Sequence, residues 1–232
     1  FKVIEDASHA LGATYNKVPI GGDNRSAACI FSFHPVKMIT TGEGGALILE
    51  CEEMFERAKR VRSHGIDYLG NSHKIKKIRP WYYEQNELGY NYRITEMQAA
   101  LGIVQISRLS SFLRKRNELS KLYKEKLKNL PLKFQSVEEN SLSSYHLFTV
   151  KITDKNYDRD ELFRFLKSHQ IASQVHYIPV YRQPFYRSLG FCKNYCENAE
   201  EYFSSCLSIP LHQKLNESDI DFVAKKLNTF FS

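Results

Sequence analysis

The chain has 232 residues and a formal net charge of +7, with 42% apolar and 25% charged residues. This length and apolar content allow one domain, or one large and one small domain, around a substantial core. The lysines and arginines are spread along the chain instead of forming a dense basic stripe, and no run of about 18 apolar residues occurs, so neither a nucleic-acid partner nor a membrane span is expected.

The cysteines indicate no metal site. Their number is odd, and the paired cysteines and histidines that hold zinc do not occur at ligand spacing. We expect free thiols in a reducing compartment, and therefore a cytoplasmic protein. The five cysteines are Cys29, Cys51, Cys192, Cys196 and Cys206.

The first half of the chain predicts short apolar strands separated by loops. Residues 1–4 are predicted to form a buried strand, and residues 27–33 and 45–49 two more. Residues 66–85 are polar and aromatic without a clear period, which indicates a long irregular loop or a covering ribbon.

Two helices are expected among these strands. The first covers 52–61 and ends near His64-Gly65. The second begins at a capping box, in which Thr95 caps the amide of Gln98 and the Gln98 side chain returns to Thr95. Its period places three apolar residues on one buried face. They are Met97, Leu101 and Val104.

A further helix is predicted over 109–130, with its basic residues forming a solvated face. Its inward residues are expected to be Phe112, Leu119, Leu122 and Leu127. Pro131 marks the end of this helix, and a smaller α+β region follows. The elements expected there are strands at 147–152 and 207–211, a loop at 175–186, and helices from 158, over 197–206 and over 217–230. We therefore predict a large domain within 1–130 and a small domain at 131–232.

One lysine lies in unusual surroundings. Residues 31–45 place Lys37 between an aromatic strand end and a turn rich in glycine and threonine. Burial of an ammonium group lowers its pKa, and the neutral amine is the form that attacks an aldehyde. The alternative interpretation is a strand, a turn and a strand with Lys37 merely exposed.

A carboxylate upstream favours the chemical interpretation. Asp6 follows a short apolar run, as at the carboxyl end of a parallel strand, where α/β folds bind their ligands. The pyridine nitrogen of pyridoxal 5′-phosphate (PLP) stays protonated beside a carboxylate, and protonation makes this cofactor an electron sink. Asp6 taken by itself could equally be a helix cap or a turn residue; together with Lys37 it predicts a PLP site.

Together these segments resemble the DegT/DnrJ/EryC1/StrS sugar aminotransferases, which are fold-type I PLP-dependent enzymes. The resemblance implies an α/β fold with part of a large mixed-sheet domain and a smaller C-terminal α+β domain. Chains of that family carry a substantial segment before the aspartate motif, so we expect this chain to be part of a larger enzyme. The matching segments are 5–13, 31–34, Lys37, 40–45, 62–65 and 88–102.

The resemblance also implies roles at the cofactor. Lys37 would be the Schiff-base lysine and general base, and Asp6 would pair with the pyridine nitrogen. His9 would lie against the ring and Ser32 would bind the phosphate. Read without the resemblance, His9 is a core histidine and Ser32 a structural serine that ends a strand.

Other roles concern the partner subunit and the substrate. Asn91 resembles the residue that reaches the partner subunit's cofactor phosphate, which implies a homodimer with shared active sites; otherwise Asn91 is a turn residue before a capped helix. Arg93 is assigned to this loop or to a substrate carboxylate or phosphate. His34, beside Lys37, is expected to point toward the sugar, and His176 and Tyr177 are candidates for the substrate loop.

The sequences of residues 34–37 and 176–181 are most similar to those of the branch of the family that makes pseudaminic acid. Those enzymes transfer an amino group from glutamate to C4 of a UDP-linked 4-keto-6-deoxy N-acetyl hexosamine. Alternatives are an aminotransferase of the same family acting on another nucleotide sugar, or a non-catalytic PLP-binding or regulatory fragment. A sugar dehydratase of the family is disfavoured, because such relatives typically replace the lysine by histidine.

Overall fold

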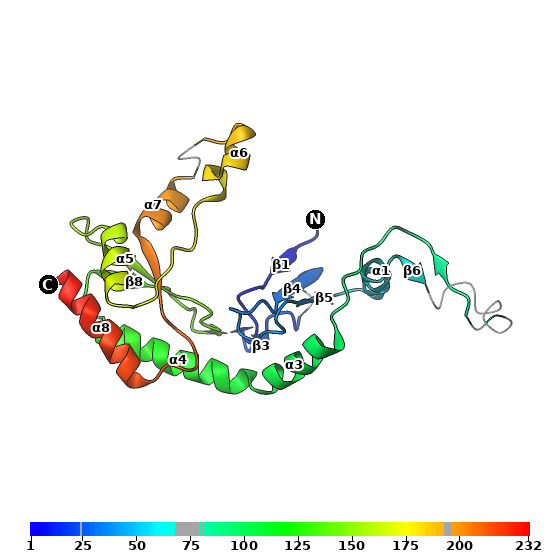
Figure 1. The fold of residues 1–232 in the computed structure, drawn as a ribbon, viewed down its shortest axis with the longest axis horizontal. Helices are drawn as coiled ribbons and strands as arrows, with labels where there is room; N and C mark the ends of the chain where they lie inside the picture. The colour runs from blue at the N-terminus through cyan, green and yellow to red at the C-terminus, as the bar shows by residue number, and fades with distance from the viewer. Residues whose placement is uncertain (24, 68–78, 80, 193–195) are drawn as a thin grey trace. The chain divides into compact units, whose positions relative to one another are not determined.

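The structure is a computed structural model that describes residues 1–23, 25–67, 79, 81–192 and 196–232. The chain divides into two compact units, Phe1–Leu109 and Ser110–Ser232. Figure 1 shows the elements of both. The division falls before the boundary predicted at 130, because the helix between these points packs into the core of the second unit.

The first unit contains a three-stranded sheet in the order β1-β4-β5. Strand β1 (Ile4–Asp6) runs parallel to β4 (Ala28–Ser32), and β5 (Gly45–Leu49) is antiparallel to β4. The strands expected at 27–33 and 45–49 are therefore present. A small core lies on one face of this sheet, around Cys29 and Phe31.

The first strand differs from its prediction in place and in burial. It begins at Ile4, which is 65% exposed, whereas a buried strand was expected over 1–4. The difference arises because β1 is an edge strand of the described sheet, so β4 covers it on one side.

The other elements of the first unit follow in chain order. A β-hairpin joins β2 (Thr14–Tyr15) to β3 (Val18–Pro19). Helix α1 (Glu52–Arg62) confirms the helix predicted there. Strands β6 (Ile66–Asp67) and β7 (Glu84–Gln85) pair as a two-stranded ribbon, and most of the loop expected between them lies outside the described residues.

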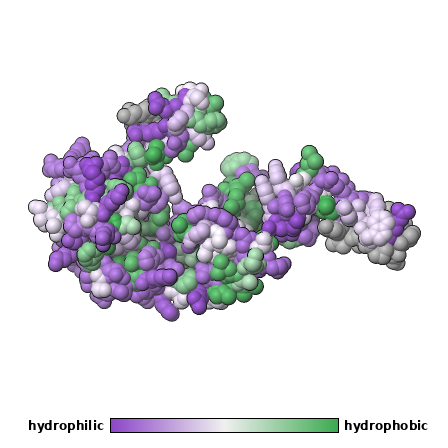
Figure 2. Space-filling view, in the orientation of Figure 1, coloured by the Kyte–Doolittle hydropathy of each residue, from purple (hydrophilic) through white to green (hydrophobic). Residues whose placement is uncertain are grey.

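Helix α3 (Glu96–Ser107) begins at the predicted capping box. The side chain of Thr95 accepts the N–H of Gln98 at 3.3 Å, and the Gln98 side chain accepts the N–H of Thr95 at 2.9 Å. Its predicted buried face is wrong, since Met97 is 83% exposed and no residue of α3 is buried. The period located the apolar face, but no described residue covers it. Figure 2 shows hydrophobic surface over this helix.

The second unit is built on an antiparallel sheet in the order β11-β10-β8. Its strands are β8 (Leu132–Phe134), β10 (Phe148–Ile152) and β11 (Cys206–Ile209). Its main helices are α4 (Leu109–Lys126), α5 (Arg159–Ser168), α7 (Glu197–Ser205) and α8 (Glu217–Phe231). The shorter elements are β9 (Ser141–Leu142), a 3-10 turn η1 (Val180–Arg182) and α6 (Pro184–Ser188). The last two occupy the segment predicted as a loop.

The second unit has the larger core. Leu119 of α4 and Leu127, directly after this helix, are buried there as predicted, beside Leu162 and Leu166 of α5 and Leu227 of α8. Full burial of one such leucine removes apolar surface worth about 1.5–3 kcal/mol from water. This core, rather than chain connectivity, therefore holds α4 in the second unit.

Arg116 on α4 contradicts the expectation that the basic residues of this helix are solvated. It is 4% exposed, and its guanidinium donates to the carbonyl oxygens of Tyr145 at 2.9 Å, His146 at 3.3 Å and Leu211 at 2.8 Å. Burial lowers its pKa to about 10. A helical period does not reveal that an arginine has carbonyl partners far away in the sequence.

No helix within the described ranges combines the length and the apolar character that a membrane crossing requires.

Candidate active site

Two parallel strands bring Asp6 and Lys37 to the same edge of the first unit's sheet. Asp6 is the last residue of β1 and lies opposite Ile30 of β4. Ser32 ends β4, and Lys37 follows it in the next turn. Because the carboxyl ends of parallel neighbours meet at one edge, residues from distant parts of the sequence share this site.

The carboxylate of Asp6 is held ionised by its own turn. Its Oδ1 accepts both the backbone N–H of Ser8 at 3.1 Å and the Ser8 hydroxyl at 2.5 Å. These bonds, the hydroxyl first, lower the pKa of Asp6, and the charges of His9 and Lys37 lower it further. In the described part of the chain, both Ser8 donors go to Oδ1 and Oδ2 is left for another donor.

The loop behind Lys37 is closed by backbone hydrogen bonds. Phe33 donates to the carbonyl oxygen of Gly44 at 2.8 Å, and Thr41 donates to that of Phe33 at 3.0 Å. Met38 and Ile39 are buried directly after the half-buried Lys37. The lysine therefore projects from a segment whose next residues are anchored.

Small residues are required at the end of this loop. Gly44 has a φ of 155°, and a Cβ there would come within 2.4 Å of Thr41 Oγ1. A Cβ on Gly45 would come within 2.7 Å of the carbonyl oxygen of Phe31. These close approaches explain the glycine pair that follows Glu43.

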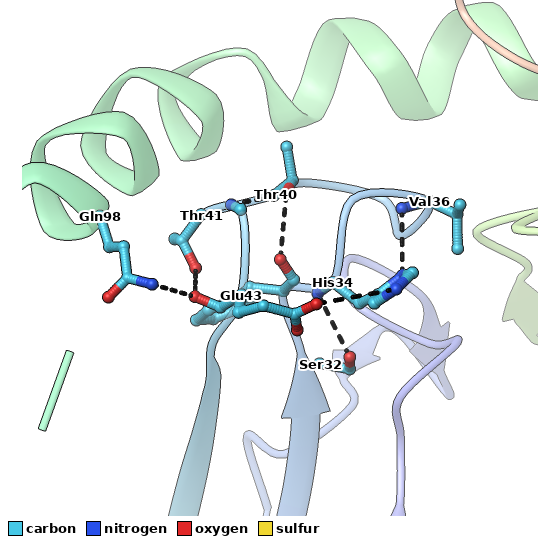
Figure 3. Close-up of polar contacts among 9 residues, drawn as sticks. Ser32, His34, Val36, Thr40, Thr41, Glu43 and Gln98 are labelled. Carbon is cyan, nitrogen blue, oxygen red and sulfur yellow. Dashed lines mark hydrogen bonds and ion pairs between the residues drawn. The ribbon is translucent and has the colours of Figure 1, made fainter. Parts of the chain in front are cut away.

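Helix α3 is joined to this loop by the residue that caps it. Besides its capping bond to Thr95, Gln98 donates from Nε2 to the carbonyl oxygen of Glu43 at 3.1 Å (Figure 3). One turn later, a Cβ on Gly102 would lie 3.0 Å from Cγ2 of Thr41, so helix and loop are in close contact. The capping box therefore both starts α3 and anchors the lysine loop.

The segment that carries Asn91 is bonded to the end of α1. Ser63 and Asn91 form an isolated β-bridge, and Tyr90 both donates to the carbonyl oxygen of Val61 at 2.7 Å and accepts from His64 at 2.8 Å. The segments 62–65 and 88–93, both part of the resemblance, are thus one structural piece. Asn91 and Arg93 are exposed at its end.

The predicted histidines of the first unit lie near this edge. His9 is half-buried, and its charge contributes to the low pKa of Asp6. His34 is exposed, its backbone N–H lies 3.4 Å from Ser32 Oγ, and its Nε2 lies 3.9 Å from Oε1 of Glu43. Figure 3 shows this arrangement around the loop.

His176 and Tyr177 belong to the second unit. Nδ1 of His176 lies 2.8 Å from the hydroxyl of Ser208 on β11, and burial lowers the pKa of the ring. The rings of His176 and Tyr177 meet edge to face at 4.6 Å.

The first unit therefore brings together Asp6 and Ser32 at strand ends with His34 and Lys37 of the segment that follows β4. Sequence reasoning gave no role at this edge to Ser8, Glu43 or the second bond of Gln98. The Asp-x-Ser spacing of residues 6–8 is a signal for Ser8, because aspartate side chains commonly bond the amide two residues on. The two others depend on contacts across the fold.

A profile of the DegT/DnrJ/EryC1/StrS aminotransferase family matches residues 1–228. The chain belongs to this family. A UDP-4-amino-4,6-dideoxy-N-acetyl-beta-L-altrosamine transaminase of Campylobacter jejuni is 41% identical over 228 residues, which cover 97% of this chain and 57% of the relative. The chain thus spans less than two thirds of that relative.

Two solved structures share the fold. PseC of Helicobacter pylori, an aminotransferase involved in pseudaminic acid biosynthesis, is 30% identical with a TM-score of 0.87, over 100% of this chain and 60% of PseC. Spr1654 of Streptococcus pneumoniae, assigned as a sugar aminotransferase and solved in its PMP form, gives 28% identity and a TM-score of 0.90, over 99% of this chain and 59% of that protein. The predicted α/β fold of fold-type I PLP-dependent transferases is confirmed.

The cofactor of the family is PLP, and the S. pneumoniae relative is known in both PLP and PMP forms. The residues of this chain fit the group. An ionised carboxylate with a free oxygen suits a protonated pyridine nitrogen, and a lysine at the same sheet edge suits the aldehyde. The hydroxyl of Ser32 can donate to a phosphate oxygen.

Proposed function

We propose that this chain forms part of a PLP-dependent nucleotide-sugar aminotransferase in which Lys37 binds the cofactor. The observation that carries the proposal is the placement of Asp6 and Lys37 at one edge of the β1–β4 pair. Their separation in the sequence makes this pairing a property of the fold. The Ser8 hydrogen bonds are the main cause of the lowered pKa of Asp6, and the charge of Lys37 makes a smaller contribution in the same direction.

Each residue then has a defined task. Bound PLP supplies an electron sink for the carbon that loses or gains a proton. Asp6 would hold the pyridine nitrogen in its protonated form, Ser32 would bind the phosphate, and His9 would contact the ring. Lys37 would hold the cofactor through its amine, and the same amine would serve as the general base that takes the proton from the substrate carbon.

The substrate we propose is a UDP-linked 4-keto-6-deoxy N-acetyl hexosamine, with glutamate as the amino donor, as in pseudaminic acid synthesis. The support is the 41% identity to a transaminase named for the corresponding 4-amino sugar nucleotide. His34, Arg93, His176 and Tyr177 are the candidate substrate residues. A family aminotransferase acting on another nucleotide sugar is the alternative.

We further propose a cytoplasmic homodimer in which Asn91 reaches the cofactor phosphate of the partner subunit. Asn91 supports this by its exposure at the end of a segment anchored to α1.

Glutamate-dependent amination of keto nucleotide sugars, followed by mass spectrometry of the product, tests the proposed activity. Product should form with the UDP-linked 4-keto sugar and should be lost in Lys37→Ala. Amination that survives in Lys37→Ala would reject the assignment of this lysine. Product from a different nucleotide sugar alone would favour the alternative substrate.

A further inference from the structure

The turn that carries Lys37 is held by hydrogen bonds more than by apolar packing. The carbonyl oxygen of His34 accepts the N–H of Lys37 at 2.9 Å, which closes a four-residue turn. Pro35 at its second position supplies the backbone φ that such turns favour. Val36 at its third position is 63% exposed, so little burial fixes the turn.

The ring of His34 supports the same turn. Its Nδ1 accepts the N–H of Val36 at an N–N distance of 3.4 Å (Figure 3). Asp and Asn side chains stabilise turns by this bond to the amide two residues on. His34 therefore holds two consecutive amides, that of Val36 through its ring and that of Lys37 through its carbonyl oxygen.

Acceptance at Nδ1 sets the protonation of the ring. A neutral imidazole that accepts at Nδ1 carries its proton on Nε2. The carboxylate of Glu43 lies 3.9 Å from Nε2, which is longer than a hydrogen bond, on the side of the ring that carries the proton in this tautomer.

The backbone of Glu43 is held at its carbonyl oxygen. Its carbonyl oxygen accepts the hydroxyl of Thr41 at 2.7 Å and Nε2 of Gln98 at 3.1 Å. A continuous series of contacts thus leads from the first turn of α3, through Glu43 and His34, to the turn of Lys37.

We infer that His34 is a positioning residue for Lys37, and that Glu43 orients its ring. The inference rests on the proposed function for the role of Lys37. It gives His34 a task inside the lysine turn, in addition to the substrate contact proposed for it.

Three substitutions test the turn without cofactor. His34→Ala removes the ring acceptor, His34→Asn retains an acceptor in reach of the Val36 amide, and Glu43→Gln removes the charge facing the ring. The water-exchange rate of the Val36 amide, measured by NMR, should rise about three- to tenfold in His34→Ala, the range expected for one neutral hydrogen bond. His34→Asn should remain within about twofold of the wild type, with Glu43→Gln between the two. Glu138→Gln, at an exposed glutamate of the second unit, is the control and should change nothing.

A pH series distinguishes the hydrogen bond from simple packing of the ring. Protonation places a hydrogen on Nδ1 and ends its acceptance. Among the described residues, the charged group recorded beside the ring is the carboxylate of Glu43, and Lys37 lies three residues further on in the same turn. Protection of the Val36 amide should fall as the wild-type His34 becomes protonated and should stay constant in His34→Asn.

Labelling of Lys37 separates this inference from the proposed function. PLP followed by borohydride should attach a pyridoxyl group to Lys37, more slowly in His34→Ala than in His34→Asn. Unchanged Val36 exchange in His34→Ala, or equal damage in His34→Asn, would overturn the inference alone. Absence of labelling at Lys37 in the wild type would overturn the proposed function and the inference with it.

Discussion

Asp6 is kept ionised by a local turn instead of a buried counter-ion. Both donors of Ser8 converge on Oδ1, and the charges of His9 and Lys37 add to their effect. The lowered pKa means that this carboxylate contributes stability above pH 3.8 and loses it as the pH falls through the pKa of the folded state. The same ionisation is what a protonated pyridine nitrogen requires.

Replacement of Ser8 by alanine should raise the pKa of Asp6 toward its ordinary value, because the hydroxyl bond is the largest cause of the shift. A ¹³C NMR titration of the Asp6 carboxyl measures this directly. Ser8→Thr keeps the hydroxyl and should titrate like the wild type. An unchanged pKa in Ser8→Ala would assign the shift to the surrounding charges.

Ser208 is the residue on which the ring of His176 depends. It is 5% exposed, and its hydroxyl lies 2.8 Å from Nδ1 of His176 and 3.2 Å from Oγ1 of Thr149. Ser208→Ala should lower the free energy of unfolding by about 1 kcal/mol, because it leaves a partly buried ring nitrogen without its partner. Urea denaturation at pH 8 measures the change, and Ser204→Ala on the exposed face of α7 serves as the control.

The stability of the fold should decrease with falling pH partly because of His176. Burial lowers its pKa, so the unfolded chain takes up the proton at a higher pH than the fold does. Its stabilisation is therefore present above pH 6.5 and is lost as the pH falls from there. The loss between pH 8 and pH 5.5 should be smaller in His176→Gln, although not absent, because burial shifts the pKa of His212 in the same direction. An identical loss of stability in both proteins would show that groups other than His176 cause the pH dependence.

Among the elements, the junction between α1 and the Asn91 segment depends most on a glycine. Gly65 has a φ of 71°, and a Cβ there would lie 1.7 Å from the carbonyl oxygen of Glu87. Gly42 has a φ of 83° but nothing within 4 Å of its Cβ position. The pair therefore separates backbone strain from steric overlap.

Gly65→Ala should lower the free energy of unfolding by more than about 2 kcal/mol, since backbone must move to admit the methyl group. Gly42→Ala should cost about 1 kcal/mol, the cost of a left-handed conformation for alanine. Denaturation curves of the two variants give the comparison. Equal losses in the free energy of unfolding would mean that the backbone after α1 moves to admit the methyl group at little cost.

Arg116 joins α4 to two other segments of the second unit, through carbonyl groups before β10 and after β11. Arg116→Met should lower the free energy of unfolding by about 3 kcal/mol, because buried carbonyl oxygens lose their donor. Arg114→Met, at an exposed position on the same helix, should have little effect. A well-tolerated Arg116→Met would show that water replaces the guanidinium.

Local signals in the sequence predicted several elements, and long-range contacts account for the rest. The capping box at Thr95 and the run at 45–49 depend on neighbouring residues, and both predictions are confirmed. The exposure of Met97 and the burial of Arg116 depend on what other segments cover or contact. At the site, motifs indicated Asp6 and Lys37, but the role of Gln98 becomes visible only where α3 meets the loop.

At the scale of the whole molecule, the chain exposes apolar side chains on α3 and covers 57% of a relative's length. The proposed homodimer with shared sites has a specific consequence. Lys37→Ala and Asn91→Ala, if each removes activity, should complement one another after mixing and exchange of subunits. Half of the dimers would be hybrids with one intact site in two, so about a quarter of the wild-type activity should return. No recovery, despite hybrids detected by native mass spectrometry, would place Lys37 and Asn91 in the site of the same subunit.

The covalent attachment of PLP to Lys37 is the central claim, and peptide mass spectrometry tests it most directly. After incubation with PLP and borohydride reduction, the peptide containing Lys37 should carry a pyridoxyl group, and the Lys37→Ala protein should carry none. A pyridoxyl group on another lysine, present equally in both proteins, would contradict the account.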